Sequence, residues 1–185
     1  RNNLLFRCRA DAIGLSGDNV NGTTSVGNEI INNTVIGDPA LVTRSAIFID
    51  HNVTVEIYNN NLYGWDWCGL EAGGNMPSHI TTGYNNFYDS IGGRQQYRID
   101  AASTHVMAAP DTTSDPMFVD ATTGDGHLLE GSPCIDAGDP SFTTTTDIDG
   151  NGLQGLAIDQ GCDERMLDYN EAAMYFWRAT EGNTT

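Results

Sequence analysis

The sequence predicts an all-β solenoid, in which short parallel strands wind into stacked coils, and three observations lead to this prediction. An asparagine-rich motif recurs about every 25 to 30 residues. Apolar and polar residues alternate between the copies of the motif, as they do in strands with one buried face. Residues 1–110 lack the amphipathic stretches of about 10 or more residues that helical repeats need.

The repeat appears when the chain is aligned with itself. VGNEIINNTVIG (26–37) matches VTVEIYNNNLYG (53–64) at an offset of 27 residues, with Val, Glu, Ile, two Asn and Gly in common. GYNNFYD (83–89) is a third copy, and NNLLFR (2–7) is a truncated fourth copy. A repeat of this length suits one coil of a β-solenoid.

The recurring asparagines are expected to form a ladder. In stacked coils the same turn recurs about every 4.8 Å, so an asparagine side chain can bond to the asparagines above and below it. The ladder satisfies polar groups that would otherwise be buried and unpaired. Asparagine also tolerates the left-handed backbone of a tight turn. These residues are therefore interpreted as structural and not as catalytic.

Composition limits the partners that the chain can bind. The chain has 185 residues, of which 25 are acidic and 8 are basic, and its formal net charge is −17. All the basic residues are arginine. A surface this negative repels phosphate backbones and anionic lipids, and no apolar run approaches the roughly 20 residues of a membrane span. We expect neither nucleic-acid binding nor membrane insertion.

The coils resemble those of right-handed parallel β-helix proteins, the pectate-lyase-like superfamily. The segments DPMFVDATTGDGHLLEGSPCIDAGDPS (115–141) and TDIDGNGLQGLAIDQGCDE (146–164) resemble the closing segment of large secreted bacterial and archaeal β-helix proteins. The chain departs from that pattern at Cys162, which occupies a position where alanine is usual. The resemblance implies a right-handed parallel β-helix at an extracellular or cell-surface location, and it implies no single reaction.

Three regions follow from these patterns. Residues 1–110 are expected to form the coils, and residues 111–165 are expected to form a closing segment that caps them. Residues 166–185 contain helix-favouring Ala, Met and Glu, with Asp168 as a candidate cap and Gly182 as a stop, so we expect a short terminal helix.

An acidic stripe is predicted on one outer face. One buried column is predicted from the inner strand positions Leu15, Ile49, Leu70 and Ile99. The residues that follow three of them, Asp50, Glu71 and Asp100, would then lie outside, about 5 Å apart along the stack. Two carboxylates at this spacing suit a retaining glycosidase or a calcium site, and a solvated acidic face is the alternative. The prediction depends on the register, because a slip of one residue turns every side chain over.

Two further candidates accompany the acidic stripe. Trp65 and Trp67 are candidates for substrate binding, because an aromatic face can stack on a sugar; packing in the core or in a turn is the alternative. Arg98 precedes Asp100 by two residues, so it would share the same outer face and is a candidate base for a lyase.

A calcium site is predicted in the closing segment. The segment DIDGNG places oxygen-bearing side chains at alternate positions, Asp147, Asp149 and Asn151, as in the first half of an EF-hand loop. A true EF-hand is excluded, because Ile158 occupies the position of the bidentate glutamate. Asp159 or Asp163 could complete a looser site, and the alternative is a turn that bonds to its own backbone.

Cys134 and Cys162 are predicted to form a disulfide. They lie in two motif blocks of the closing segment that should pack together, and an oxidising exterior would favour the bond. Cys8 and Cys68 fall about two coils apart, which is too far for a bond.

Two hypotheses for the function remain open. The first is a non-catalytic extracellular or cell-surface module with a structural, adhesive or assembly role, possible calcium stabilisation and polysaccharide contact, and upstream β-helix coils or a neighbouring protomer as partner. The alternative is a polysaccharide lyase or glycoside hydrolase that uses Asp50, Glu71 and Asp100, with Arg98 as its base. A groove in which those acids converge beside Trp65 or Trp67 would favour the enzyme.

Overall fold

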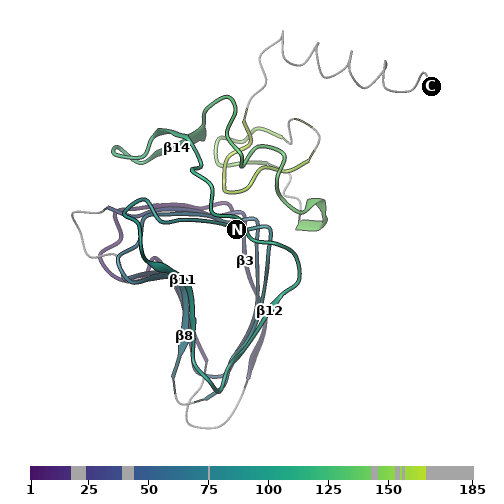
Figure 1. The fold of residues 1–185 in the computed structure, drawn as a ribbon. Helices are drawn as coiled ribbons and strands as arrows, with labels where there is room; N and C mark the ends of the chain where they lie inside the picture. The colour runs from purple at the N-terminus through teal and green to yellow at the C-terminus, as the bar shows by residue number, and fades with distance from the viewer. Residues whose placement is uncertain are drawn as a thin grey trace.

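The chain forms a parallel β-solenoid in the computed structural model, which describes residues 1–17, 24–38, 44–74, 76–142, 146–152, 155 and 157–165. Viewed along the solenoid axis, the successive coils superpose (Figure 1). Three parallel sheets, here called sheets A, B and C, form the walls, and each contains four strands. The predicted all-β solenoid is therefore confirmed.

The strands follow one another in the order A, B, C within each coil. Sheet A consists of β1 (Leu4–Phe6), β4 (Thr34–Ile36), β7 (Asn61–Tyr63) and β10 (Asn86–Tyr88). Sheet B consists of β2 (Ile13–Ser16), β5 (Ser45–Asp50), β8 (Cys68–Gly73) and β11 (Gln95–Ile99). Sheet C consists of β3 (Ser25–Ile31), β6 (Val53–Tyr58), β9 (His79–Gly83) and β12 (Thr104–Met107).

The sequence repeat sets the register of the stack, because corresponding positions of successive copies pair with each other. Glu29 pairs with Glu56 between β3 and β6, and Thr34 pairs with Asn61 between β4 and β7, both at the offset of 27 residues. Asn86 pairs with Asn61 between β10 and β7, as the third copy of the motif predicts. Each copy is therefore one coil.

An apolar core fills the space between the sheets. Its buried members are Ile30, Val35, Ala46, Ile47, Ile49, Val53, Val55, Ile57, Leu62, Trp65, Leu70, Ala72, Ile80 and Phe87. Strand β6 shows the expected alternation, because Val53, Val55 and Ile57 are buried while Glu56 is exposed. Removal of this apolar surface from water is the main force that holds the coils together.

The predicted asparagine ladder runs the length of the stack. The side-chain amide Nδ2 of each ladder asparagine donates to Oδ1 of the member in the next coil, and all four distances are 2.9 Å. The members are Asn3, Asn33, Asn60, Asn85 and Asp111. The last member is an aspartate, which the repeat did not predict.

A left-handed residue precedes each ladder asparagine. The backbone φ is 55° at Asn2, Asn32, Asn59 and Tyr84. Three of these four residues are asparagine, which is the non-glycine residue that adopts this conformation most readily. The turn therefore explains the pairs Asn2–Asn3, Asn32–Asn33 and Asn59–Asn60, in which the first asparagine is left-handed and the second belongs to the ladder.

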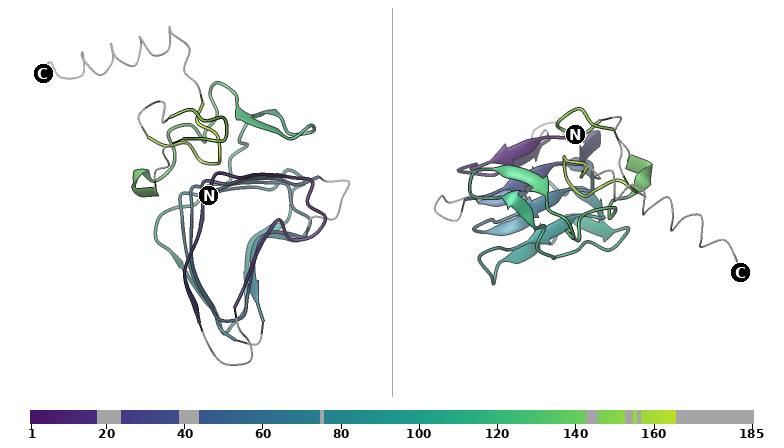
Figure 2. Two further views of the ribbon diagram at one scale, coloured as in Figure 1. Left: turned by 180° about the vertical axis from the view of Figure 1, so that it is seen from behind. Right: turned by 90° about the horizontal axis from the view of Figure 1, so that it is seen from above.

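The closing segment packs along the outer face of sheet A. It contains β13 (Phe118–Asp120), β14 (Asp125–Leu128) and the 3-10 turn η1 (Pro140–Phe142), and it lies beside the triangular stack (Figures 1 and 2). Ile36 of β4 is fully buried against Phe118, Leu128 and Cys134. We predict from the sequence that this segment caps the coils, but it packs on their flank, because sheet A presents apolar side chains such as Ile36, Phe6 and Tyr63 on its outer face as well as burying Val35 and Leu62 on its inner face.

The predicted helix within residues 166–185, including Asp168, lies outside the described residues. Among the residues that are described, no helix is long and apolar enough to cross a membrane.

Candidate functional site

The predicted acidic stripe does not form, because the register of sheet B differs from the predicted one. Leu70 pairs with Ile47, and Ala72, not Leu70, pairs with Ile49. Glu71 therefore lies beside Phe48 and Arg98, two residues out of line with Asp50. The alternation of apolar residues could not distinguish these registers, since Leu70 and Ala72 both fit a buried column.

The other two acids of the predicted stripe, Asp50 and Asp100, interact with residues close to them in the sequence. Asp50 Oδ1 lies 3.1 Å from His51 Nδ1. Asp100 Oδ1 accepts hydrogen bonds from the backbone amides of Ala102 at 3.0 Å and Ser103 at 2.7 Å, so it supports the turn that follows β11. The structure therefore does not bring Asp50, Glu71 and Asp100 together.

Glu71 is a buried carboxylate held by basic and hydroxyl groups. Only 2% of the residue is exposed. Its Oε1 lies 2.6 Å from Arg98 Nη1 and 3.7 Å from Arg44 Nη2, and its Oε2 accepts from Ser45 Oγ at 2.9 Å. Arg98 is therefore an ion-pair partner of Glu71, and its guanidinium also lies over the ring of Trp67, 5.2 Å from the centroid.

The two candidate tryptophans have different environments. Trp65 is 1% exposed and packs edge-on against Phe87, with the ring centroids 6.2 Å apart, so its predicted role in substrate binding is wrong. Trp67 is 50% exposed and is the one of the pair that a ligand can reach. Both residues lie in the irregular segment between β7 and β8, where strand alternation does not indicate which side chain turns inward.

The predicted calcium ligands do not form one group. Asp147 Oδ1 accepts from the amides of Asp149 at 2.9 Å and Asn151 at 2.7 Å, which is the bonding of a turn to its own backbone. Asp159 accepts from the amides of Asp136 at 2.7 Å and Arg165 at 2.8 Å. Burial raises the pKa of Asp159 to about 6.

Asp149 instead joins a cluster around His127, to which sequence analysis assigned no role. His127 Nε2 lies 2.7 Å from Asp149 Oδ2 and 3.9 Å from Asp163 Oδ1. The other ring nitrogen, Nδ1, lies 2.5 Å from Asp125 Oδ1. Hydrogen bonds to Asp149 and Asp125 raise the pKa of His127 to about 9. The spacing of these residues in the sequence carries no signal, because they come from separate loops and one short strand.

The predicted disulfide between Cys134 and Cys162 is not formed, and both residues are free cysteines. Cys134 Sγ accepts from the side-chain amides of Asn61 and Asn86, each at 3.4 Å. The backbone amide of Cys162 donates to Thr34 Oγ1 at 3.1 Å. Both cysteines thus anchor the closing segment to sheet A. Burial raises the pKa of Cys134 to about 12 and that of Cys162 to about 11, so neither thiol is a ready nucleophile.

A hollow of about 490 Å³ opens at the first coil. Its lining combines core side chains with polar ladder residues, and includes Leu5, Ile13, Leu15, Ile30 and Asn33. The first strands of the three sheets, β1, β2 and β3, each have a partner on one side only. This end of the stack, here called the N-terminal edge, therefore presents free strand edges beside an exposed part of the core.

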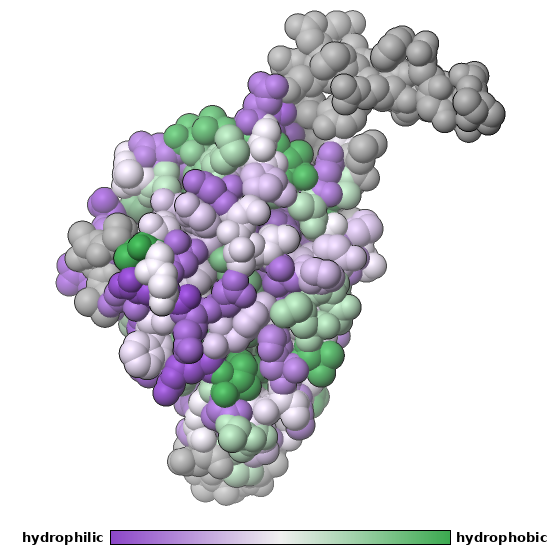
Figure 3. All heavy atoms as spheres, viewed as in Figure 1, coloured by the Kyte–Doolittle hydropathy of each residue, from purple (hydrophilic) through white to green (hydrophobic). Residues whose placement is uncertain are grey.

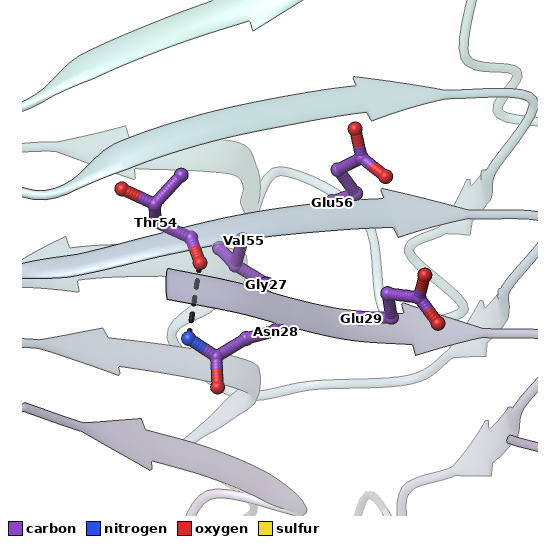
Figure 4. Close-up of a pocket in the computed structure, with 6 residues that line it drawn as sticks. All are labelled: Gly27, Asn28, Glu29, Thr54, Val55 and Glu56. Carbon is purple, nitrogen blue, oxygen red and sulfur yellow. Dashed lines mark hydrogen bonds between the residues drawn. The ribbon is translucent and has the colours of Figure 1, made fainter. Parts of the chain in front are cut away.

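A smaller hollow of about 220 Å³ lies on the outer face of sheet C (Figure 4). Glu29 and Glu56 project from facing positions of neighbouring strands, and Asn28 Nδ2 donates to the carbonyl of Thr54 at 3.0 Å. Arg1 forms an ion pair with Glu29, which offsets part of the repulsion between the two glutamates.

No protein-family model, curated protein or solved structure matches this chain.

Proposed function

We propose that the chain is a non-catalytic β-solenoid module of an extracellular or cell-surface protein, and that it assembles by stacking its N-terminal edge against a further β-solenoid coil. The observation that carries the proposal is the open hollow at that edge, which combines apolar core surface with free strand edges. Exposed edges of this kind are templates for pairing with another strand.

The ladder specifies which kind of coil fits the edge. Inside the stack, each asparagine Oδ1 accepts from the Nδ2 and the backbone amide of the preceding coil, as Asn60 accepts from Asn33 at 2.9 and 3.0 Å. Within the described residues, Asn3 Oδ1 receives no such bond. A coil that ends in the same pair of asparagines would supply both donors and would continue all three sheets.

The catalytic alternative has less support. A lyase or hydrolase needs carboxylates or a base that can reach substrate, whereas Glu71 is buried between Arg98 and Arg44. One observation favours polysaccharide contact as a further role of the module: Trp67 is half exposed and carries Arg98 against its ring. The closing motifs, through their resemblance to secreted proteins, support the proposed location.

The proposal can be tested by adding one coil. A copy of residues 32–58 is fused directly before Asn2 in place of Arg1, which sets the new ladder asparagine 27 residues ahead of Asn3, the spacing between Asn33 and Asn60. We expect a higher melting temperature and slower hydrogen exchange of the β1, β2 and β3 amides. The matched control carries alanine at the copied Asn33, and we expect a smaller rise in its melting temperature.

Sedimentation of the unmodified chain separates the two sources of a partner coil. Because the fused coil presents an open edge of the same kind, concentration-dependent association of both the unmodified and the extended chain would identify a second copy as the partner, and monomers in both cases would identify a coil of another polypeptide or of a longer one. An added coil that leaves melting and exchange unchanged would contradict the proposal.

A further inference from the structure

We propose that His127, Asp149 and Asp163 bind a divalent transition-metal ion, with Zn²⁺ as the probe, and that the ion fastens three segments of the closing region together. The three candidate ligand atoms, one from each residue, all lie within 4.8 Å of one another. They come from β14, from the turn after Asp147 and from the segment that ends the described chain. This site is independent of the proposed stacking at the N-terminal edge.

The buried member of the group is the observation that points to a ligand. Asp163 is only 5% exposed, and its Oδ2 accepts one long hydrogen bond from the Leu128 amide at 3.3 Å. Its Oδ1 receives no hydrogen bond from the described residues and is directed towards His127 Nε2, 3.9 Å away. At 3.9 Å the His127 ring is an ion-pair partner but is too far away to form a hydrogen bond with this oxygen, and a cation bound between the two would neutralise the carboxylate more closely.

The distances between the candidate ligands suit a small ion. Ligand atoms around tetrahedral zinc, with bonds of about 2.1 Å, lie about 3.4 Å apart. The observed separations from His127 Nε2, 2.7 Å to Asp149 and 3.9 Å to Asp163, bracket that value. The two carboxylate oxygens lie no more than 4.8 Å apart, so a bound ion would draw them together, and half of the His127 side chain is exposed, which leaves room for water as a fourth ligand.

The composition of the group favours a transition metal over calcium. Calcium takes six to eight oxygen ligands, whereas imidazole suits zinc, cobalt, nickel and copper. The ring of His127 is also oriented as it is in many metal sites. Its Nδ1 is held by the Asp125 carboxylate at 2.5 Å, which directs Nε2 towards Asp149 and Asp163. We assign Asp125 as a positioning residue.

The test measures zinc binding by titration calorimetry at about pH 8, because protons compete with metals for imidazole. It uses the full chain with Cys8→Ser, since Cys8 is the one cysteine that is not buried. We expect His127→Gln and Asp149→Asn each to weaken zinc binding by about tenfold or more. Asp149 is half exposed, so Asp149→Asn should fold normally even if another variant does not. His79→Gln, which changes an exposed histidine outside the group, should leave binding unchanged.

Two further measurements test the assignment of ligands. Asp125→Asn should weaken binding by about 10- to 100-fold, with the metal still bound through the same atoms. Substitution with Co²⁺ should give a visible absorption spectrum that His127→Gln changes and His79→Gln does not. Zinc binding that survives both His127→Gln and Asp149→Asn would overturn the proposal, as would a site that binds Ca²⁺ and not Zn²⁺, or no binding at all.

Discussion

The two ends of the solenoid complete the same ladder in different ways. At the first coil, Asn3 is exposed beside a hollow of about 490 Å³ that is lined by core residues. At the last coil, Asp111 Oδ1 accepts a hydrogen bond from the side-chain amide of Asn85. Its other oxygen, Oδ2, accepts from Thr82 Oγ1 at 2.8 Å and from Tyr97 Oη at 2.5 Å. The ladder residue of the first end retains an acceptor for another coil, whereas both side-chain oxygens of the last ladder residue already accept hydrogen bonds.

The chemistry of the last residue explains this difference. Asparagine both donates and accepts through its side chain, so it passes the ladder on to the next coil. An ionised aspartate only accepts, and it therefore ends the ladder without leaving an amide that needs a partner. The ring of Tyr97 packs on that of His105, with the centroids 4.7 Å apart, and adds cover to this coil. Hydrophilic residues make up most of this face, and the hydrophobic residues on it are scattered (Figure 3).

The largest effect is expected where the ladder has neighbours on both sides. Asn60 is fully buried, and its Nδ2 donates to Asn85 Oδ1 and to the carbonyls of Ile30 and Tyr58 at 2.8 to 2.9 Å. Asn60→Ala leaves several buried groups unpaired, so we expect the free energy of unfolding in urea to fall by about 3 kcal/mol or more. A loss as small as that of an exposed substitution would show that the ladder is not a source of stability.

Asp111→Asn should have an intermediate effect on the free energy of unfolding, because it gives the last coil the same ladder residue as the first coil. The new amide nitrogen cannot accept, so the hydroxyls of Thr82 and Tyr97 must rotate or lose a partner. We expect a loss of about 1 to 2 kcal/mol in the same urea experiment, together with faster hydrogen exchange in β12. Asp111→Glu, which keeps the charge but changes the reach, is the control. An unchanged stability would show that asparagine can end the ladder equally well.

Asn3→Ala should have a small effect. Asn3 is exposed, and its amide donates to Asn33 Oδ1 and to the carbonyl of Arg1. Water can replace both bonds, so we expect a loss of less than about 1 kcal/mol. In the protein with the added coil, the same substitution should cost more, because Asn3 then lies inside the stack. Equal losses in the two proteins would argue that the coil does not stack there.

The smallest effect should be a dependence on pH at the last coil. Burial lowers the pKa of His105, and the charge of Asp111 opposes this shift. Because the pKa in the folded state lies below the ordinary value of about 6.5, this contribution to stability is present above about pH 6.5 and is lost as the pH falls through the folded-state value. The difference in unfolding free energy between the wild type and His105→Gln, measured from about pH 7 to about pH 5, should therefore shift in favour of the variant. A difference that does not change with pH would contradict this assignment.

Repetition made much of the fold predictable. The asparagines at 33, 60 and 85 recur with the turn that needs them, so one alignment of the chain with itself indicated the coil length, the parallel strands and the ladder. The end of the ladder at Asp111 could not be recognised in the same way, because it departs from the repeat. Only the hydrogen bonds of Asn85, Thr82 and Tyr97 show that this residue occupies the ladder position.

The sequence by itself determined the solenoid, the register of sheets A and C near the ladder, and the alternation of buried and exposed residues, because each depends on a local pattern that every coil repeats. The tertiary structure decided the register of Glu71, the burial of Trp65 and the approach of Asp149 to His127. These features depend on turns of unequal length and on loops without periodicity, where the path of the chain is set by packing against distant segments.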